Sequence, residues 1–528
     1  MPPPALSKTE SQSRAAPPPV SDAPEPLPSS PVPSAPPSAP SPTPLSPADV
    51  RAIFIGLMLT SFLAALNQTI VAPALPTLGR HFGDFQNLSW IVTAYLLTST
   101  AVAPLYGKLS DIHGRRAMML VSIGIFLAGS AVCAAASNML MLILGRALQG
   151  LGGGGIFPIA QAIMADTITP RERGRFQAYM GTVWITSGVG GPILGGFLAE
   201  HFSWQAIFWL NVPIGLAAAV MTHRNLKRLP RHDRKHKLDL VGAALMMAAA
   251  VALLLALNWG GTRFPWLSPT ILGLIALSGA ISLVFAWRLT GAPEPFLPLA
   301  VLANPIMRTG TVATSMAMAV SVGLTIMLPL YFEVVHGMTA TASGLALIPL
   351  ALTTPGSILS GRAMMRGRRY KWVPLVALAF AVVALIFLTI RPDAPLTAVL
   401  ILMSVVGTGI GTVYPVATVA IQNAVSRYQV GVAMGAMNFF RALTSAFAVA
   451  IMGAVVLAGY GSAPERGGGG VKVLSPGLAA ASGLDLAFTF RWVFAVSALF
   501  LALGILALLL MEERPLRGPG DPVAVPAE

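Results

Sequence analysis

A short segment between two apolar runs combines one carboxylate with closely spaced basic residues. It reads GKLSDIHGRR from Gly107 to Arg116, and Asp111 precedes Arg115 by four positions. A carboxylate at this spacing can pair with the arginine, and it can also accept hydrogen bonds at the start of a facing helix. We therefore expect a gate that forms when one side of the protein is closed. The simpler alternative is a solvated basic turn that only orients the chain, but this would not require Asp111 or the glycines Gly107 and Gly114.

Four polar side chains lie well inside other apolar runs. Arg146 and Gln149 are three residues apart, so they share one helix face. A guanidinium inside an apolar run requires polar partners or water. Asn67 and Gln68 can hydrogen-bond a substrate, but an amide does not exchange a proton at physiological pH. We expect these four side chains to line a central cavity, and the alternative is that Arg146 is structural and bonds to backbone carbonyls or to the first helix.

Three further side chains complete the candidate set. Trp184 lies about a third of the way along its run, where it would line a cavity or pack in the core. No acid or histidine falls clearly at the middle of a run, so Glu333 is the best remaining proton carrier, with a water-exposed rim carboxylate as the simpler interpretation. We expect Arg441, in NFFRAL, within one or two turns of the cytoplasm, where it would reach the membrane surface or act in a second gate.

Several kinds of function are disfavoured. The single cysteine, Cys133, lies in an apolar run, so we expect neither a disulfide framework nor a cysteine metal site. The sequence has no Walker A motif, which argues against ATP hydrolysis. The net charge is +14, but the basic residues fall in alternate loops, so we expect no nucleic-acid partner. We expect no enzymatic activity, no cofactor and no metal.

These side chains must be positioned by membrane helices. The chain of 528 residues is 55% hydrophobic and 10% charged, whereas a soluble protein has about 25% charged residues. Its apolar residues form fourteen blocks, and a chain in lipid must satisfy its backbone hydrogen bonds internally, so each block predicts a helix. The blocks lie near 52–78, 88–107, 117–136, 139–164, 176–199, 204–222, 239–258, 268–289, 309–332, 343–363, 372–390, 396–421, 432–457 and 488–511.

The distribution of basic residues predicts the orientation. An even number of spans places both termini on one side of the membrane. Lysine and arginine are about four times as frequent in the loops on the side of residues 107–116, which the positive-inside rule assigns to the cytoplasm. Residues 1–49 are rich in Pro, Ser and Ala and lack the apolar core of a signal peptide. We expect them to form a disordered cytoplasmic tail.

A weak internal repeat predicts the domain organisation. The segment GRAMMRGRR at 361–369 resembles residues 107–116 but has Met365 in place of Asp111. Related loops in two halves indicate duplicated bundles, a common plan in secondary transporters. We expect an all-α polytopic membrane protein with fourteen transmembrane helices. The expected parts are the tail at 1–49, a six-helix bundle at 50–222, two inserted helices with a basic linker at 223–292, a second six-helix bundle at 293–511 and a cytoplasmic tail at 512–528.

Several motifs together resemble the major facilitator superfamily. GKLSDIHGRR resembles its motif A, GRALQG at 145–150 its motif B, and residues 181–196, which end in GGPILGG, motif C of the antiporter branch. LNQTIVAPALP, WIVTAYLL and FWLNVPIG resemble the fourteen-span drug:proton antiporters of the EmrB/QacA type. The resemblance covers roughly residues 52–512.

The resemblance implies roles for particular residues. It adds Asp166 to the gate formed by Asp111 and its arginines, and it implies that Arg146 tunes or relays a proton. Members of this family often carry an acid at the position of Asn67, so the amide here leaves the route of proton coupling open. Motif C would form a hinge between the halves, with ordinary small-residue packing as the alternative. Its expected hinge residues are Gly188, Gly191, Pro192 and Gly195.

We predict a secondary active transporter that works by alternating access. The main expectation is proton-driven export of amphiphilic small molecules, of the multidrug type that confers antibiotic resistance, across a bacterial-type inner (plasma) membrane. Its partners would be the lipid bilayer, the substrate and protons, and a periplasmic adaptor is left unknown. One alternative is a transporter of a specific metabolite, for which Arg146 and the missing central acid would favour an anion. The other is a non-transporting receptor or scaffold.

Overall fold

The computed structural model describes residues 46–84, 87–228, 239–261, 263–292, 295–366, 369–460 and 486–516. Apart from turns and one isolated bridge between Gly260 and Phe264, these residues form helices. Thirteen of the helical segments in this part of the chain are long and apolar enough to cross a membrane. The expected all-α polytopic fold class is therefore confirmed, whereas the expected disorder of residues 1–45 lies outside the described residues.

The first helix begins earlier than expected. α1 spans Pro47–Thr69 and is capped by Ser46, whose side-chain oxygen accepts the Asp49 N–H at 3.1 Å. The Asp49 carboxylate in turn accepts the Ser46 N–H at 3.3 Å, which completes a capping box. Residues 47–49 therefore belong to the helix and not to the tail. The expected helix at 52–78 is also divided, because a short 3-10 turn at Ala72–Ala74 separates α1 from α2.

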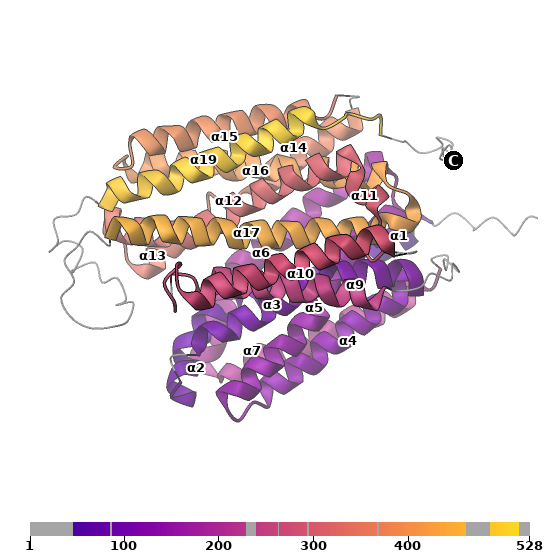
Figure 1. Ribbon diagram of the computed structural model, residues 1–528, viewed down its shortest axis with the longest axis horizontal. Helices are drawn as coiled ribbons and strands as arrows, with labels where there is room; N and C mark the ends of the chain where they lie inside the picture. Colours follow the sequence, from indigo (N-terminus) through magenta and orange to yellow (C-terminus); the bar gives the residue numbers. More distant parts are fainter. Residues whose placement is uncertain are drawn as a thin grey trace, which may run out of the picture. The chain divides into compact units, whose positions relative to one another are not determined.

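Following the expected organisation, we describe the helices as two groups and an inserted pair (Figure 1). The first group contains α1, α2 (Leu75–Phe82), α3 (Leu88–His113), α4 (Arg115–Ala134), α5 (Met139–Thr167), α6 (Pro170–His201), α7 (Trp204–Trp209) and α8 (Asn211–Asn225). The inserted pair is α9 (Leu240–Trp259) and α10 (Pro269–Gly291). The second group contains α11 (Leu299–Ala303), α12 (Pro305–His336), α13 (Ala340–Leu345), α14 (Thr353–Arg366), α15 (Trp372–Ile390), α16 (Leu396–Ala424), α17 (Val430–Tyr460) and α19 (Leu486–Leu510).

Two helix pairs provide most of the contact between the groups. α3 of the first group packs on α17 of the second, and α6 packs on α14. α9 touches both α3 and α17, so the inserted pair lies along this junction (Figure 1). Because the two groups meet through a few identifiable helices, the residues on these helices decide how firmly the groups are held together.

The expected helix at 343–363 is interrupted, which is why thirteen spans are found in place of fourteen. Its two pieces, α13 and α14, have 6 and 14 residues, and a membrane span needs about 20. Pro349 lies in the break, where it has no N–H to donate and its ring blocks a regular helix. The N–H of Ile348 instead bonds to Leu345 O at 3.1 Å, three residues back.

The interrupted segment packs directly on α16. A Cβ atom added to Gly411 would overlap the carbonyl oxygen of Thr353, and one added to Gly407 would overlap that of Leu350. The Ser357 hydroxyl donates to Gly411 O at 2.9 Å across the same contact. Glycines therefore allow the two backbones to touch where the helix is broken, as small residues do between membrane helices.

We expect Gly411→Ala to lower the melting temperature of the purified protein in detergent, because the new methyl group must displace the Thr353 backbone. Overpacking of this kind costs about 1–3 kcal/mol. Gly453→Ala in α17 is the matched control, since nothing lies within 4 Å of a Cβ atom there and alanine is the better helix former. Equal melting temperatures for the two variants would contradict the close contact between α14 and α16.

Candidate functional site

Asp111 lies in the last turn of α3 and reaches the first turn of α17. Its Oδ1 accepts the Gly431 N–H at 3.2 Å, and its Oδ2 accepts the Val432 N–H at 2.9 Å. α17 begins at Val430, so these N–H groups have no partner within their own helix. A carboxylate is disfavoured near the C-terminal end of its own helix but favoured at the start of another. Asp111 therefore caps a helix of the second group. The sequence indicated that Asp111 could bind the start of a facing helix, but it did not identify which helix.

Arg115 connects Asp111 to Asp166 at the end of α5. Its Nη1 forms an ion pair with Asp111 and donates to Ser110 Oγ at 2.7 Å, and its Nε donates to Asp166 Oδ2 at 3.0 Å. The three charged side chains are only 5–7% exposed. Removing one partner from a buried ion pair typically costs about 3–5 kcal/mol. We call Asp111, Arg115, Asp166 and the two N–H groups of α17 the α3–α17 latch.

The glycines of the same segment have separate roles. A Cβ atom on Gly431 would lie 2.5 Å from Gly107 O, so the two glycines allow α3 and α17 to touch beside the latch. Gly114 joins α3 to α4 with a φ of 90°, a conformation that side chains disfavour. Arg116 lies apart from the latch, because its Nη2 contacts the His223 ring on α8 at 3.0 Å. The structure therefore brings Gly107, Asp111 and Arg115 together but not Arg116.

A second polar contact joins the two groups near the ends of α5 and α16. Gln422 of α16 donates from Nε2 to Gln161 O of α5 at 3.2 Å and accepts Arg173 Nη1 of α6 at 3.3 Å. Arg173 also donates from Nε to Ile168 O at 2.8 Å. The sequence did not single out these residues. Amides inside an apolar run, at 161, and directly after one, at 422, are the signal that could have identified them.

Arg146 is buried within the first group. Its Nε donates to Ile91 O at 2.9 Å, and its Nη1 donates to Asn67 Oδ1 at 3.2 Å and to Gln149 Oε1 at 2.6 Å. Its guanidinium carbon lies 4.5 Å from the centre of the Tyr95 ring. Arg146 is 1% exposed, and Asn67 and Gln149 are fully buried. These three side chains therefore lie inside the first group and do not line an open cavity, contrary to expectation.

Ser130 and Asn211 extend this buried network. The Gln149 amide donates to Ser130 Oγ at 2.6 Å, and the Asn211 amide donates to Ser130 Oγ at 3.3 Å and to Asn67 Oδ1 at 3.4 Å. All of these side chains are neutral, and no carboxylate in the described part of the chain forms an ion pair with Arg146. The sequence did not single out Ser130, Asn211 or Tyr95, although Asn211 is a polar residue in an apolar run.

Gln68 and Trp184 remain partly exposed, unlike the buried network. Gln68 directly follows Asn67 near the end of α1 and is half-buried. Trp184 of α6 is also half-buried and stacks on Phe157 of α5, with 5.0 Å between ring centres. Of the residues expected to line a substrate cavity in the first group, these two are therefore the most accessible.

Two of the motif C glycines, Gly191 and Gly195, pack within the first group. A Cβ atom on Gly191 would overlap Thr69 Oγ1, and one on Gly195 would overlap Ile70 O, so both face the end of α1. Gly188 and Pro192 are exposed. The contact that Gly191 and Gly195 of motif C make in this structure is thus with α1 and not with the second group.

The contact of α6 with the second group uses other glycines. A Cβ atom on Gly174 would lie 3.0 Å from Gly361 Cα in α14. A Cβ atom on Gly181 would lie 3.4 Å from Thr354 Oγ1, an ordinary contact distance. The closest approach of α6 to the second group therefore lies near the start of α6, before motif C.

The remaining candidates, Glu333 and Arg441, lie in the second group. Glu333 is half-buried in the last turn of α12 and accepts a hydrogen bond from Ser343 Oγ at 3.1 Å. Arg441 lies about three turns inside α17, not one or two as expected. Its guanidinium carbon is 5.0 Å from the Tyr414 ring centre, so the half-buried side chain packs against α16.

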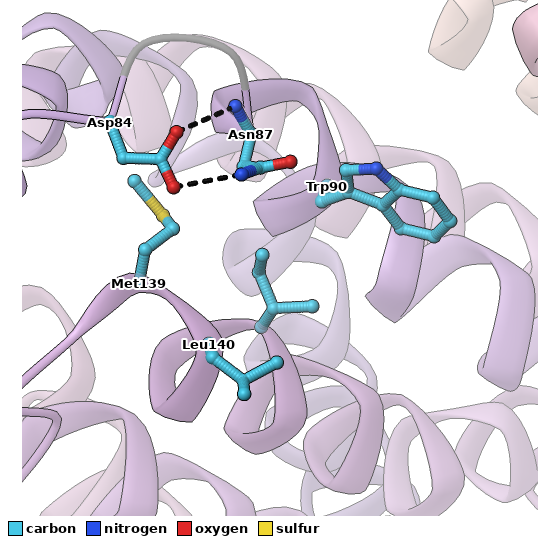
Figure 2. A pocket seen from close by; sticks show the side chains of 6 residues that line it. Asp84, Asn87, Trp90, Met139 and Leu140 are labelled. Atoms are coloured by element: carbon cyan, nitrogen blue, oxygen red, sulfur yellow. Dashed lines mark hydrogen bonds between the residues drawn. The ribbon is translucent and has the colours of Figure 1, made fainter.

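A small pocket lies at the other end of the first group, beside the start of α3 and α5. Figure 2 shows that Asp84 faces Asn87, whose backbone N–H and side-chain amide both donate to the carboxylate, at 3.2 and 2.8 Å. The pocket has a volume of about 260 Å³ and is lined by Asp84, Asn87, Trp90, Met139, Leu140 and Ile143. None of these residues was singled out from the sequence.

We expect Asp111→Asn to expose the start of α17, because the neutral side chain loses its ion pair with Arg115 and binds the N–H groups more weakly. The test uses Cys133→Ser protein with a new cysteine at Ala433, which is fully buried. A membrane-impermeant maleimide should label this cysteine about tenfold faster when Asp111 is replaced, since a buried pair has lost a partner.

The control for this test is Asp393→Asn, because the Asp393–Arg391 pair has both side chains 63% exposed. This exposed pair contributes little to stability, so the labelling rate should equal that of the protein in which both Asp111 and Asp393 are kept. Equal labelling rates in the Asp111 and Asp393 variants would show that the α3–α17 latch does not protect the start of α17.

Comparison with known proteins places this geometry in a family. The sequence profile of the Major Facilitator Superfamily matches residues 57–449. The uncharacterized MFS-type transporter MT1926 of Mycobacterium tuberculosis is 36% identical over 418 residues, which cover 78% of this chain and 60% of the relative. The chain thus spans about three fifths of that relative's length. The multidrug transporter protein MdtP of Bacillus subtilis is 32% identical over 413 residues, covering 77% of this chain and 75% of the relative.

Solved structures agree on the fold. The human organic anion transporter MFSD10 (TETRAN) superposes with a TM-score of 0.61, covering 89% of this chain and all of that chain. Its sequence identity is 16%, so this likeness concerns the fold alone.

Proposed function

The chain belongs to the Major Facilitator Superfamily, and from this premise we propose that it exports amphiphilic small molecules by alternating access. The observation that carries the proposal is the cap that Asp111 of the first group forms on α17 of the second. The similarity to a protein named as a multidrug transporter supports export of this kind of substrate.

In this proposal the two helix groups are the bodies that move, with boundaries near those expected from the sequence. The α3–α17 latch exists only while α3 and α17 touch, so it stabilises the state in which this end is closed. Gln161, Arg173 and Gln422 stabilise the same state from α5, α6 and α16. Substrate or proton binding must offset both contacts before this end can open.

We assign the closed end to the cytoplasm, as the distribution of basic residues predicts. Both termini would then be cytoplasmic, in a bacterial-type inner membrane. We also place the chain in the fourteen-span EmrB/QacA type. α9 and α10 supply the two extra helices of that type, and α13 and α14 together would supply the span that is interrupted here.

The finer part of the proposal is coupling to protons. Asp111 and Asp166 share one guanidinium, so the latch contains one more carboxylate than arginine. Protonation of either acid would weaken the ion pairs and favour opening. Glu333 is the remaining candidate proton carrier. It lies in the last turn of α12, away from the latch, and accepts a hydrogen bond from Ser343. Arg146 would tune proton coupling from inside the first group, because its partners are neutral and leave its positive charge uncompensated.

We expect inverted vesicles that contain the protein to accumulate a fluorescent amphiphile when a pH gradient is imposed, acid inside, and to stop when an uncoupler collapses the gradient. Asp111→Asn should slow accumulation about tenfold at equal protein amount, because the closed state loses a buried ion pair. Asp393→Asn should transport normally. If a diverse set of amphiphiles is tested and the flux of none of them depends on the pH gradient, proton-driven export is overturned.

A further inference from the structure

We propose that Arg441 binds the anionic group of the substrate, so that the exporter selects amphiphilic anions. This inference rests on the proposed export function and names its substrate class. It begins from the place of Arg441 on α17, about three turns from the start of the helix. At this depth a guanidinium has to find polar partners, water or a ligand.

The partners of Arg441 come from three helices of the second group, and all are neutral. Nη1 donates to Asn438 Oδ1 at 3.3 Å, and Nη2 lies 3.5 Å from the sulfur of Met318 on α12. The guanidinium carbon lies 5.0 Å from the centre of the Tyr414 ring on α16. Nε is buried and has no hydrogen-bond partner. One charged donor of Arg441 is therefore unsatisfied.

Three other arginines inside the described helices are compensated or enclosed. Arg115 has two carboxylate partners, and Arg288 has Asp239. Arg146 has no carboxylate partner but is 1% exposed and bonded to a carbonyl and two amides. Arg441 differs from all three, because it is half-buried and has no carboxylate partner in the described part of the chain. It is thus both uncompensated and reachable.

The chemistry around Arg441 matches an anionic amphiphile. A carboxylate or sulfonate can accept hydrogen bonds from Nε and a neighbouring Nη of one guanidinium, and such charge-assisted bonds are the strong ones. Tyr414 and Met318 offer an aromatic face and a polarizable thioether for the apolar body of the ligand. A cation would meet the guanidinium charge without an opposing carboxylate, so it should bind more weakly.

The test uses three pyrene probes that share one short alkyl chain and end in a sulfonate, a hydroxyl or a quaternary ammonium. Their binding to full-length protein in lipid nanodiscs is followed by energy transfer from tryptophan to pyrene. We expect the wild type to bind the sulfonate at least about tenfold more tightly than the ammonium, since hydrogen bonds to charged groups contribute about 1.5–3 kcal/mol.

Arg441→Gln should remove this preference by weakening sulfonate binding about tenfold or more, while binding of the hydroxyl probe stays unchanged. Arg441→Lys should retain part of the preference, because it keeps the charge but loses the planar fork. Arg391→Gln is the matched control, since that arginine is 63% exposed in a surface pair, and it should bind all three probes as the wild type does.

Three outcomes would overturn the assignment. The wild type could prefer the ammonium probe or bind no probe. Arg441→Gln could weaken the binding of all three probes equally, or it could leave the binding of all three unchanged. Equal weakening would identify Arg441 as a structural residue. The readout is binding, so it is separate from export. Selective sulfonate binding with no gradient-driven flux in vesicles would refute the export function alone.

Discussion

The central electrostatic interaction between the two helix groups is that of the Asp111 carboxylate with the N–H groups at the start of α17. Near the end of α3 this carboxylate meets the negative end of its own helix dipole, and near the start of α17 it meets the positive end of another. Arg115 and Asp166 complete the charge distribution in a site that is almost closed to solvent. The interaction is favourable only while α3 and α17 touch, so it links a local hydrogen bond to the state of the whole protein.

The cost of placing a charge among membrane helices explains the other polar features. Arg146 is stabilised by a carbonyl, two amides and an aromatic ring, and none of its partners can exchange a proton at physiological pH. In the second group Arg441 has a similar aromatic neighbour but keeps an unsatisfied donor. The first arginine therefore suits a structural or tuning role, and the second suits ligand binding.

Local features were predictable from the sequence, and long-range partners were not. The apolar blocks identified most spans, and the four-residue spacing of Asp111 and Arg115 identified their pair, because both depend on neighbouring residues. The N–H of Gly431, which Asp111 caps, lies 320 residues later in the chain, so no spacing could identify it as the partner. The length of the apolar block at 343–363 predicted one helix, although Pro349 interrupts it. The spacing of the glycines could not show that Gly191 and Gly195 face α1.

The most direct test of the central claim is a distance measurement by double electron–electron resonance. Spin labels would be attached at His113, at the end of α3, and at Arg366, at the end of α14, in protein that carries Cys133→Ser. Both positions are exposed at the closed end. The wild type should show a dominant short distance, and Asp111→Asn should add a population at longer distance as the groups separate. Identical distance distributions in the two proteins would contradict the role of the α3–α17 latch.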